Sequence, residues 1–290
     1  MEPSQISSNQ SSYADRLDDS RRFIAYFWSK LAKDRIQLNA GSLSYMTLLS
    51  LVPLLGVMVA VFTAFPAFEQ VSGQLEAFVF RNFVPAAGEQ IQKSLQAFVA
   101  NTKQMTAFGI LFLVVVAMML MAAVDRTIDD IWENPHRRGI ANAFMLYWSV
   151  LTLGPLLIGA GPAASSFLLA AAEESVISHV GLESVGLQNG LLKVLPYLTS
   201  VLAFMMLYTL VPGERVRFLH ALTGAVVAAV LFELSKQLFA LYITEFSTYE
   251  ALYGALAAVP ILFIWVYLSW VVVLLGAEVT YCLGHYKEAG

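Results

Sequence analysis

Residues 218–243, FLHALTGAVVAAVLFELSKQLFALYI, decide the fold of this chain. A helix needs about 20 mainly apolar residues to cross a hydrocarbon core of about 30 Å, and this run is long enough. Only helices and closed barrels satisfy their backbone hydrogen bonds in lipid, and the run lacks the alternating pattern of a barrel strand. The stretch therefore predicts a transmembrane helix.

Five further apolar runs have the same character, and they lie at roughly Ala40–Phe65, Ala107–Val124, Ala143–Ala172, Leu192–Val211 and Leu252–Leu283. The chain of 290 residues is 58% hydrophobic and only 13% charged. Ordinary soluble domains are about 45–50% apolar and about 25% charged, so this composition excludes that class. We predict an all-α polytopic membrane protein whose six transmembrane helices form one domain over residues 39–284.

Most of the cations fall on one side of the predicted membrane domain. They precede the first run or lie in the connections after the second and fourth runs, at Arg16, Arg21, Arg22, Lys30, Lys33, Arg35, Arg126, Arg137, Arg138, Arg215 and Arg217. Cytoplasmic segments carry an excess of Lys and Arg. We therefore predict that both termini are cytoplasmic and that residues 285–290 form a cytoplasmic tail. An even number of spans agrees with this orientation.

The chain before the first run divides into two parts. Residues 1–19 are polar, so we expect a disordered cytoplasmic tail and no cleavable signal peptide. In residues 20–38, Phe23, Ile24 and Phe27 fall near one helical face, which predicts an amphipathic interfacial helix. This helix either lies on the anionic membrane surface or packs on the bundle.

Residues 66–104 form the largest connection outside the predicted spans. Two amphipathic pieces are separated by the break at residues 85–88, Pro-Ala-Ala-Gly. We predict a helical hairpin on the periplasmic side of the membrane. Three roles suit it: a lid over a cavity, a docking surface for a periplasmic protein, or a simple cover over apolar surface.

An acidic and a basic residue lie inside the run at 218–243. Glu233 and Lys236 are three residues apart and share a helix face, and Gln237 continues it. Moving an ionisable side chain from water into a span costs free energy, so such residues mark functional sites by default. A paired carboxylate and ammonium cost less free energy to desolvate than either group alone. The pair is therefore either a transport site for a substrate or a proton, or a structural pair.

Charged residues near the ends of two other runs form further candidates for a polar site. Asp125 and Asp129 share one face at the end of the second run, and Arg126 can reach Asp130 at i+4. Glu278 lies near the cytoplasmic end of the sixth run. These groups either form a gate or ion-pair network or serve as ordinary interfacial anchors.

Prolines and small residues mark two further patterns. Candidate helix breaks lie at Pro53, Pro155, Pro162 and Pro260. A proline removes a backbone hydrogen bond and bends the helix, and broken helices near mid-membrane often line transport sites. The small residues between Ala221 and Ala229 predict a close-packing strip, which serves helix packing or dimerisation.

No catalytic motif is present in the sequence. It contains no phosphate-binding loop, dinucleotide-binding turn, HExxH or GxSxG motif. Its histidines are scattered without metal-ligand spacing, and Cys282 is the one cysteine. We therefore expect no enzymatic activity, no cofactor and no metal site.

Four segments carry a resemblance to a known family. They are AGSLSYMTLLSLVPLL (40–55), DRTIDDIWE (125–133), LYTLVPGERVRFLHALTGAVVAAVLFELSKQLFALY (207–242) and YGALAAVPILFIWVYLSWVVVLLGAE (253–278). In this order, over about residues 20–284, the chain resembles the YihY/BrkB family of bacterial inner-membrane proteins. The resemblance implies six transmembrane helices in the bacterial cytoplasmic membrane and no settled activity.

Members of that family have been called ribonuclease BN, serum-resistance factors or virulence factors, and some are linked to movement of lipid or lipopolysaccharide precursors. A metal-dependent nuclease needs clustered metal ligands, and RNA binding needs an exposed basic or aromatic groove. The short cytoplasmic segments of this chain offer neither. We therefore expect no nuclease activity and no nucleic-acid partner.

We expect instead a transporter or flippase-like protein for a lipid or another amphiphile. Polar heads would pass Glu233 and Lys236 while the tails stay in lipid. Anionic headgroups would be contacted by Arg126, Arg137, Arg138, Arg215 and Arg217. The alternatives are an ion-coupled exporter of small solutes and an envelope scaffold that binds a periplasmic protein through residues 66–104. Assembly into a homo-oligomer stays open.

Overall fold

The computed structural model describes residue 19 and residues 21–64, 107–134, 139–153, 183–245 and 258–287. Every regular element in these ranges is an α-helix, which confirms the predicted all-α class. The predicted hairpin at 66–104 and nearly all of the predicted tail at 1–19 lie outside the described residues.

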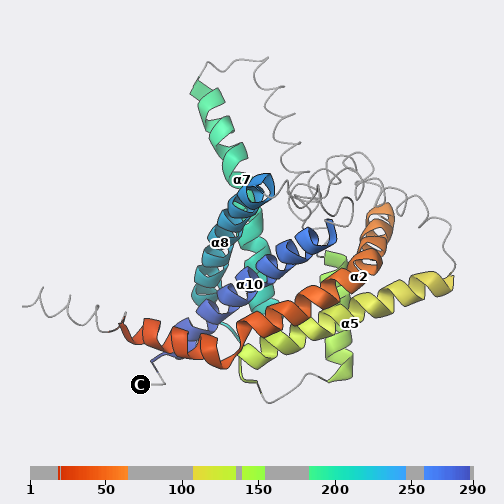
Figure 1. Ribbon diagram of the computed structural model, residues 1–290, viewed down its shortest axis with the longest axis horizontal. Coiled ribbons are helices and arrows are strands. Elements are labelled where there is room, and N and C mark those ends of the chain that lie inside the picture. The colour runs from red at the N-terminus through yellow and green to blue at the C-terminus, as the bar shows by residue number, and fades with distance from the viewer. Residues whose placement is uncertain are drawn as a thin grey trace, which may run out of the picture.

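The described helices follow one another along the chain as shown in Figure 1. They are a first helix over residues 21–33, α2 (Ile36–Ala64), α5 (Ala107–Ile131), a helix over Ile140–Leu153, α7 (Glu183–Leu210), α8 (Phe218–Glu245) and α10 (Ala258–His285). The helix at Ile140–Leu153 is called the groove helix below.

The long helices pack in a row whose order differs from their order in the sequence. Helix α5 packs against α2, α2 against α10, α10 against α8, and α8 against α7 (Figure 1). The last described helix therefore lies in the middle of the row, and α5 and α7 lie at its two ends. This order separates candidate residues on α5 from those on α8.

Three described helices are long and apolar enough to cross a membrane: Leu111–Ile131, Phe218–Ile243 and Val259–His285. Shorter apolar helices lie at Ile140–Leu153 and Tyr197–Leu210. Helix α2 continues through Pro53, which is buried. The six-span topology remains a prediction, because the described residues supply three such spans.

The strip of small residues on α8 packs against α10, as the helix-packing interpretation predicts. Ala221, Ala225 and Ala228 are fully buried. A Cβ atom added to Gly224 would lie 2.6 Å from the backbone oxygen of Gly276, and one added to Gly276 would lie 2.7 Å from the Cβ of Ala228. Small residues therefore allow the two backbones to approach closely.

Hydrogen bonds join α10 to its other neighbours. The indole N–H of Trp270 donates to Oγ1 of Thr47 in α2 at 2.9 Å. The hydroxyl of Tyr208 in α7, which is fully buried, donates to the backbone oxygen of Val273 at 2.8 Å. A polar group buried away from water must find such a partner, so both bonds fix the packing of the row.

The helix over residues 21–33 packs on the bundle with one face and leaves the other exposed. Phe23 and Phe27 pack against the core, whereas Ile24 and Trp28 are exposed. The ring of Phe23 also meets Tyr286 beyond the end of α10, at 5.5 Å between centroids. The helix therefore contacts the bundle, and its exposed apolar residues suit the membrane surface.

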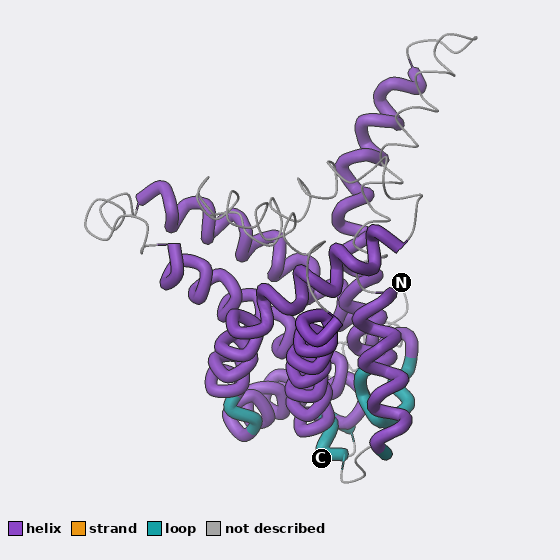
Figure 2. Tube along the Cα trace, turned by 90° about the vertical axis from the view of Figure 1, so that its right-hand side faces the viewer, coloured by secondary structure: helices purple, strands orange, loops and turns teal. Residues whose placement is uncertain are grey.

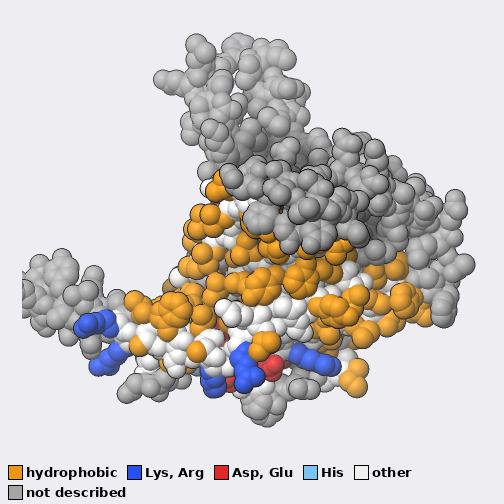
Figure 3. All heavy atoms as spheres, in the orientation of Figure 1, with side chains coloured by type: hydrophobic (Ala, Val, Ile, Leu, Met, Phe, Trp, Pro, Cys, Tyr) orange, Lys and Arg blue, Asp and Glu red, His pale blue; other side chains and the backbone are white. Residues whose placement is uncertain are grey.

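The described loops gather at one end of the bundle, where they appear teal in the lower part of Figure 2. Lys, Arg, Asp and Glu side chains lie along the matching edge of Figure 3, below a broad band of hydrophobic side chains. The structure thus brings together the ends of several helices that the cation pattern placed on one side. We call this the charged end.

Candidate functional site

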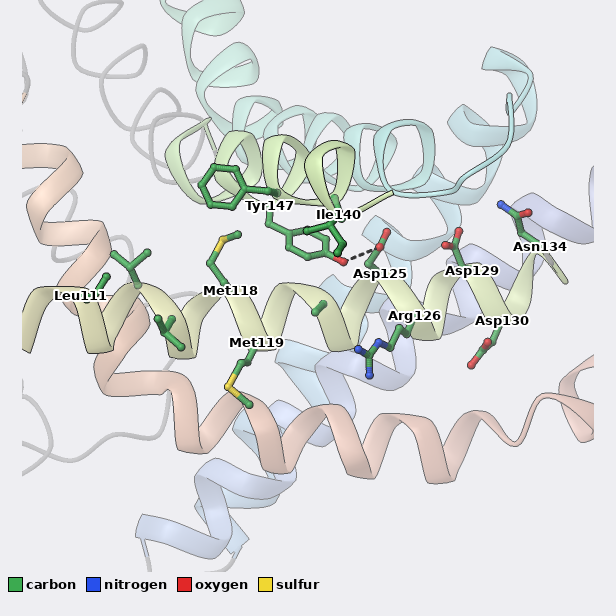
Figure 4. Close-up of a pocket in the computed structure, with 15 residues that line it drawn as sticks. Leu111, Met118, Met119, Asp125, Arg126, Asp129, Asp130, Asn134, Ile140 and Tyr147 are labelled. Carbon is green, nitrogen blue, oxygen red and sulfur yellow. Dashed lines mark hydrogen bonds between the residues drawn. The ribbon is translucent and has the colours of Figure 1, made fainter. Parts of the chain in front are cut away.

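A cavity of about 610 Å³ lies beside α5, between that helix and the groove helix (Figure 4). Most of its lining is apolar, its charged groups come from the last turns of α5, and Asn134 and Tyr147 add further polar groups. Its lining residues are Leu111, Val114, Val115, Met118, Met119, Ala122, Asp125, Arg126, Asp129, Asp130, Asn134, Ile140, Ala143, Phe144 and Tyr147. We call this cavity the α5 groove.

The residues that α5 contributes recur every three to four positions, so they form one stripe along the helix. From Leu111 to Asp130 the stripe is about 28 Å long at about 1.5 Å per residue. A hydrocarbon core is about 30 Å thick. The α5 groove is therefore long enough to extend across most of a membrane.

Two buried aspartates hold the polar end of the α5 groove together. The hydroxyl of Tyr147 in the groove helix donates to Oδ2 of Asp125 at 2.8 Å (Figure 4). The backbone N–H of Gly213, between α7 and α8, donates to Oδ1 of Asp129 at 2.9 Å. These bonds join three segments of the chain around the end of α5.

Arg126 and Asp130 project from the other side of the α5 ribbon, toward α2 in Figure 4. Both side chains are exposed. Among the described residues no ion pair joins them, although the i+4 spacing allows one. Both residues still line the α5 groove, on the side of α5 that faces α2, so they give its polar end an exposed cation and an exposed anion.

Three aspartates of the groove lie at positions that are unfavourable for the stability of α5. Asp125, Asp129 and Asp130 lie in the last turns of α5, next to the negative end of the helix dipole. Acidic side chains stabilise the opposite end of a helix. Helix stability therefore does not explain these residues, whereas the hydrogen bonds to Asp125 and Asp129 give them a role in assembling the groove.

A second cluster lies where the helix over 21–33 meets the bundle. Lys30 pairs with Asp34 and lies 3.2 Å from Oε1 of Glu133, which is 2.6 Å from Nζ of Lys33. The hydrogen bonds from Lys33 and Lys30 lower the pKa of Glu133. Burial alone would lower the pKa of Lys30, but its hydrogen bonds to Asp34 and Glu133 outweigh burial and raise it.

Glu278 on α10 lies beside this cluster and is 0% exposed. Neither of its carboxylate oxygens has a hydrogen-bond partner among the residues that the structure describes. The charges that act on it are those of Asp34, Lys30 and Glu133. The structure therefore separates Glu278 from the α5 groove and groups it with the first helix.

The predicted Glu233–Lys236 pair forms as an ion pair of 2.6 Å, with side chains 29% and 22% exposed. Gln237 beside it is exposed. Lys236 lies about 27 Å from the start of α8 at about 1.5 Å per residue, so the pair is far from the charged end. It belongs to a different part of the row from the α5 groove and does not line it.

The other predicted residues are spread over the structure. Pro260 lies in the first turn of α10. Arg215 and Arg217 are exposed in the segment between α7 and α8. Pro155, Pro162, Arg137 and Arg138 lie outside the described residues. Within the described ranges, no group of three His, Cys, Asp or Glu side chains is placed to hold a metal ion.

Sequence reasoning missed the partners of the acidic residues. Tyr147 and Gly213 are 22 and 84 positions away from the aspartates that they bind, and nothing in their local sequence indicates this pairing. Lys30 and Asp34 were visible as an i+4 pair on an amphipathic helix. That spacing was a usable signal for the second cluster.

Comparison with known proteins gives a consistent result. The family model described as "Virulence factor BrkB" matches residues 27–290. A UPF0761 membrane protein of Aeromonas salmonicida is 49% identical over 93% of this chain and 91% of its own length. One from Vibrio vulnificus is 47% identical over 92% of this chain and 85% of its own. No solved structure matches.

Both comparisons lead to one conclusion, because the family model covers most of the chain and the relatives are nearly half identical to it. These relatives are named as membrane proteins, and the described helices include apolar segments of spanning length. The chain belongs to the BrkB/UPF0761 family of membrane proteins.

Proposed function

We propose that this protein binds a phosphate-bearing lipid, or a similar amphiphile, in the α5 groove and carries it across the inner membrane of a bacterium. The observation that carries the proposal is the shape and chemistry of the groove. It is one continuous cavity with apolar walls along most of α5 and charged groups at one end. An amphiphile has the same division into an apolar and a polar part.

The apolar part of the groove suits a hydrocarbon chain. Met118, Met119 and Ala122 line its middle, and the groove helix adds Ile140 and Phe144 to its lining. Methionine is flexible and adapts to irregular apolar ligands. Phe144 is 54% exposed and Ile140 is 91% exposed, so this wall is open to surrounding lipid. A chain can therefore enter the groove from the side.

The polar end suits a headgroup with a phosphate. Arg126 is exposed there, and a guanidinium matches phosphate oxygens with two parallel hydrogen bonds. Exposed Asp130 offers a partner for an ammonium group on the same headgroup. The charged end also carries Arg215 and Arg217, which would attract anionic lipids to this surface.

The proposal includes the expected topology and chemistry. Six spans would place both termini and the charged end in the cytoplasm, so that the groove takes lipid from the cytoplasmic leaflet. The length of the stripe supports passage toward the other leaflet, because it approaches the thickness of the hydrocarbon core. Transport of this kind needs no bond to be broken, in agreement with an expected lack of enzymatic activity.

A reconstituted transport assay tests this proposal. Purified protein is placed in liposomes that contain a fluorescently labelled phospholipid, and the labelled lipid that changes leaflet is measured over time. Wild type should accelerate exchange relative to empty liposomes. Ala122→Trp, which fills the groove, should abolish that gain. Val230→Trp, at an exposed position on α8 outside the groove, is the matched control and should retain it.

The headgroup contact needs its own comparison. Arg126→Gln should slow exchange about tenfold, the factor that corresponds to about 1.4 kcal/mol of lost phosphate binding. Arg21→Gln removes an exposed arginine of the first helix, which does not line the groove, and should leave the rate nearly unchanged. Equal rates with and without protein, over several headgroups, would reject the proposal.

A second candidate function is ion-coupled export of a small solute, which the Glu233–Lys236 ion pair favours. Ionisable residues in a span often mark a proton or substrate path. The two charged groups are 2.6 Å apart, and both side chains are partly exposed, so a solute can reach the pair. Glu233→Gln removes the charge at nearly constant shape. Loss of pH-dependent transport in that variant, with lipid exchange intact, would favour this alternative.

A further inference from the structure

Glu278 is the one described buried side chain whose polar oxygens lack any hydrogen-bond partner. It is 0% exposed, and α10 places it about two turns before His285. An ionised carboxylate that is buried without hydrogen bonds costs so much free energy that such a group takes up a proton instead. This side chain therefore needs an explanation that the α5 groove does not provide.

The charged and titratable groups around Glu278 and further along α10 come from several elements. The first helix and the turn after it contribute Lys30 and Asp34, and the residues after α5 contribute Glu133. Helix α10 itself adds Cys282. Helix α8 contributes His220, which lies against Gly284 further along α10. Helix α2 carries no Asp, Glu, Lys, Arg or His.

Among these neighbours, Asp34 is the one that can share a hydrogen bond with Glu278. Its carboxylate is near enough to share a hydrogen bond with Glu278, but only if one of the two acids carries a proton. The ammonium of Lys30 binds Asp34 and Glu133 and not Glu278. The two acids therefore lie next to each other, and the nearby cation is paired with Asp34 and Glu133.

The count of charges in this cluster leaves one acid without a cation. Lys30 and Lys33 supply two positive charges, and they are paired with Asp34 and Glu133. Glu278 is a third acid, and no described cation forms an ion pair with it. A proton on Glu278 would balance the cluster and supply the missing hydrogen-bond donor.

We propose that Glu278 is a proton-binding site and that its proton holds the helix over residues 21–33 on α10 through a hydrogen bond to Asp34. Loss of the proton to the cytoplasm places two carboxylates side by side. Their repulsion, and the cost of the buried charge, then release the first helix. The helix is thus a latch that opens as the cytoplasm becomes more alkaline. This inference does not depend on the proposed transport of lipid.

Infrared difference spectroscopy detects the proton directly. In detergent-solubilised protein at neutral pH, wild type should show the carbonyl stretch of a protonated carboxylic acid, and Glu278→Gln should lack it. Asp34→Asn gives a sharper result. Because that variant replaces the carboxylate that accepts the Glu278 proton with a neutral amide, the band should shift in frequency although Glu278 is still present and buried. A band unchanged in Asp34→Asn would contradict the proposed sharing with Asp34.

The accessibility of Cys282 to a thiol reagent reports whether the latch is open, so no cysteine has to be introduced. It is the one cysteine of the chain, it is fully buried, and Lys30 and Asp34 lie close to it. Maleimide labelling should therefore be slow while the first helix is docked. Glu278→Gln keeps a neutral side chain at every pH, so it corrects for the ordinary pH dependence of thiol reactivity.

The expected outcome is a ratio of labelling rates, wild type over Glu278→Gln, that changes with pH. It should be near unity in mildly acidic buffer and rise about tenfold in mildly alkaline buffer, because an unpaired buried charge costs at least the 1.4 kcal/mol that a tenfold change represents. A ratio independent of pH would overturn the latch. Absence of a difference band between wild type and Glu278→Gln would overturn the proton site itself.

Discussion

The hydroxyl of Tyr147 donates a 2.8 Å hydrogen bond to the carboxylate of Asp125, and this contact joins the groove helix to α5. Asp125 is buried in the last turns of α5, where the helix dipole disfavours an acid. Its carboxylate therefore depends on donors from outside the helix. Donors from the groove helix and from the segment between α7 and α8 therefore hold both segments against the end of α5.

Tyr147→Phe should lower the free energy of unfolding by about 1–3 kcal/mol, because a hydrogen bond to a buried charged group is lost. Thermal unfolding of the detergent-solubilised protein measures the change. Tyr45→Phe makes the same substitution at an exposed position on α2 and should have little effect. Equal melting temperatures for Tyr147→Phe and wild type would show that the bond does not hold the groove helix.

Asp129→Ala should destabilise the charged end more than Asp130→Ala does. Asp129 accepts the 2.9 Å bond from the backbone N–H of Gly213, and removal of the acceptor strands this donor at a cost of about 1–3 kcal/mol. Asp130 is exposed. Hydrogen exchange over the segment between α7 and α8 should rise in the first variant. Similar exchange in both variants would contradict the assigned role of Asp129.

Gly224→Ala should destabilise the protein by about 1–3 kcal/mol through overpacking of α8 against α10. The added methyl group would lie 2.6 Å from the backbone oxygen of Gly276, which cannot move aside as a side chain can. Gly41→Ala on α2 is the matched control, since no atom lies within 4 Å of its added Cβ. Thermal unfolding should rank wild type and Gly41→Ala above Gly224→Ala, and the reverse order would refute the packing argument.

The ion pairs of Glu133 predict a dependence of stability on pH. Because Lys33 and Lys30 lower the pKa of Glu133, its contribution should be present above the ordinary pKa of a glutamate and lost as the pH falls through the lowered value. The difference in melting temperature between wild type and Glu133→Gln should therefore be positive at neutral pH and vanish in acid. A difference that grew toward acid pH would have the wrong sign.

The sequence predicted the helical class and the apolar character of the bundle because lipid demands long apolar helices. It also placed Asp125 and Asp129 on one face, since helical spacing is a local property. The connections that were predicted to share one side do meet: Gly213 binds Asp129, and Lys33 binds Glu133.

The packing order of the helices was not predictable in the same way. The sequence does not show that α10 lies between α2 and α8, and for that reason it did not indicate that Glu278 meets the first helix. Sequence reasoning also grouped Glu278 with the aspartates of α5, whereas its neighbours are Lys30 and Asp34. Contacts between distant segments depend on tertiary packing, which periodicity within one segment does not encode.

The central claim is that the α5 groove holds a lipid in preference to the rest of the apolar surface. A phospholipid with a photoreactive acyl chain, incorporated into nanodiscs with the purified protein, tests it by the position of the crosslinks. We predict labelling concentrated on residues 111–122 and 140–147, competed by unlabelled phospholipid and lost in Ala122→Trp. Equal labelling of the exposed α8 residues Val230, Leu234 and Leu238, unchanged in Ala122→Trp, would contradict the claim.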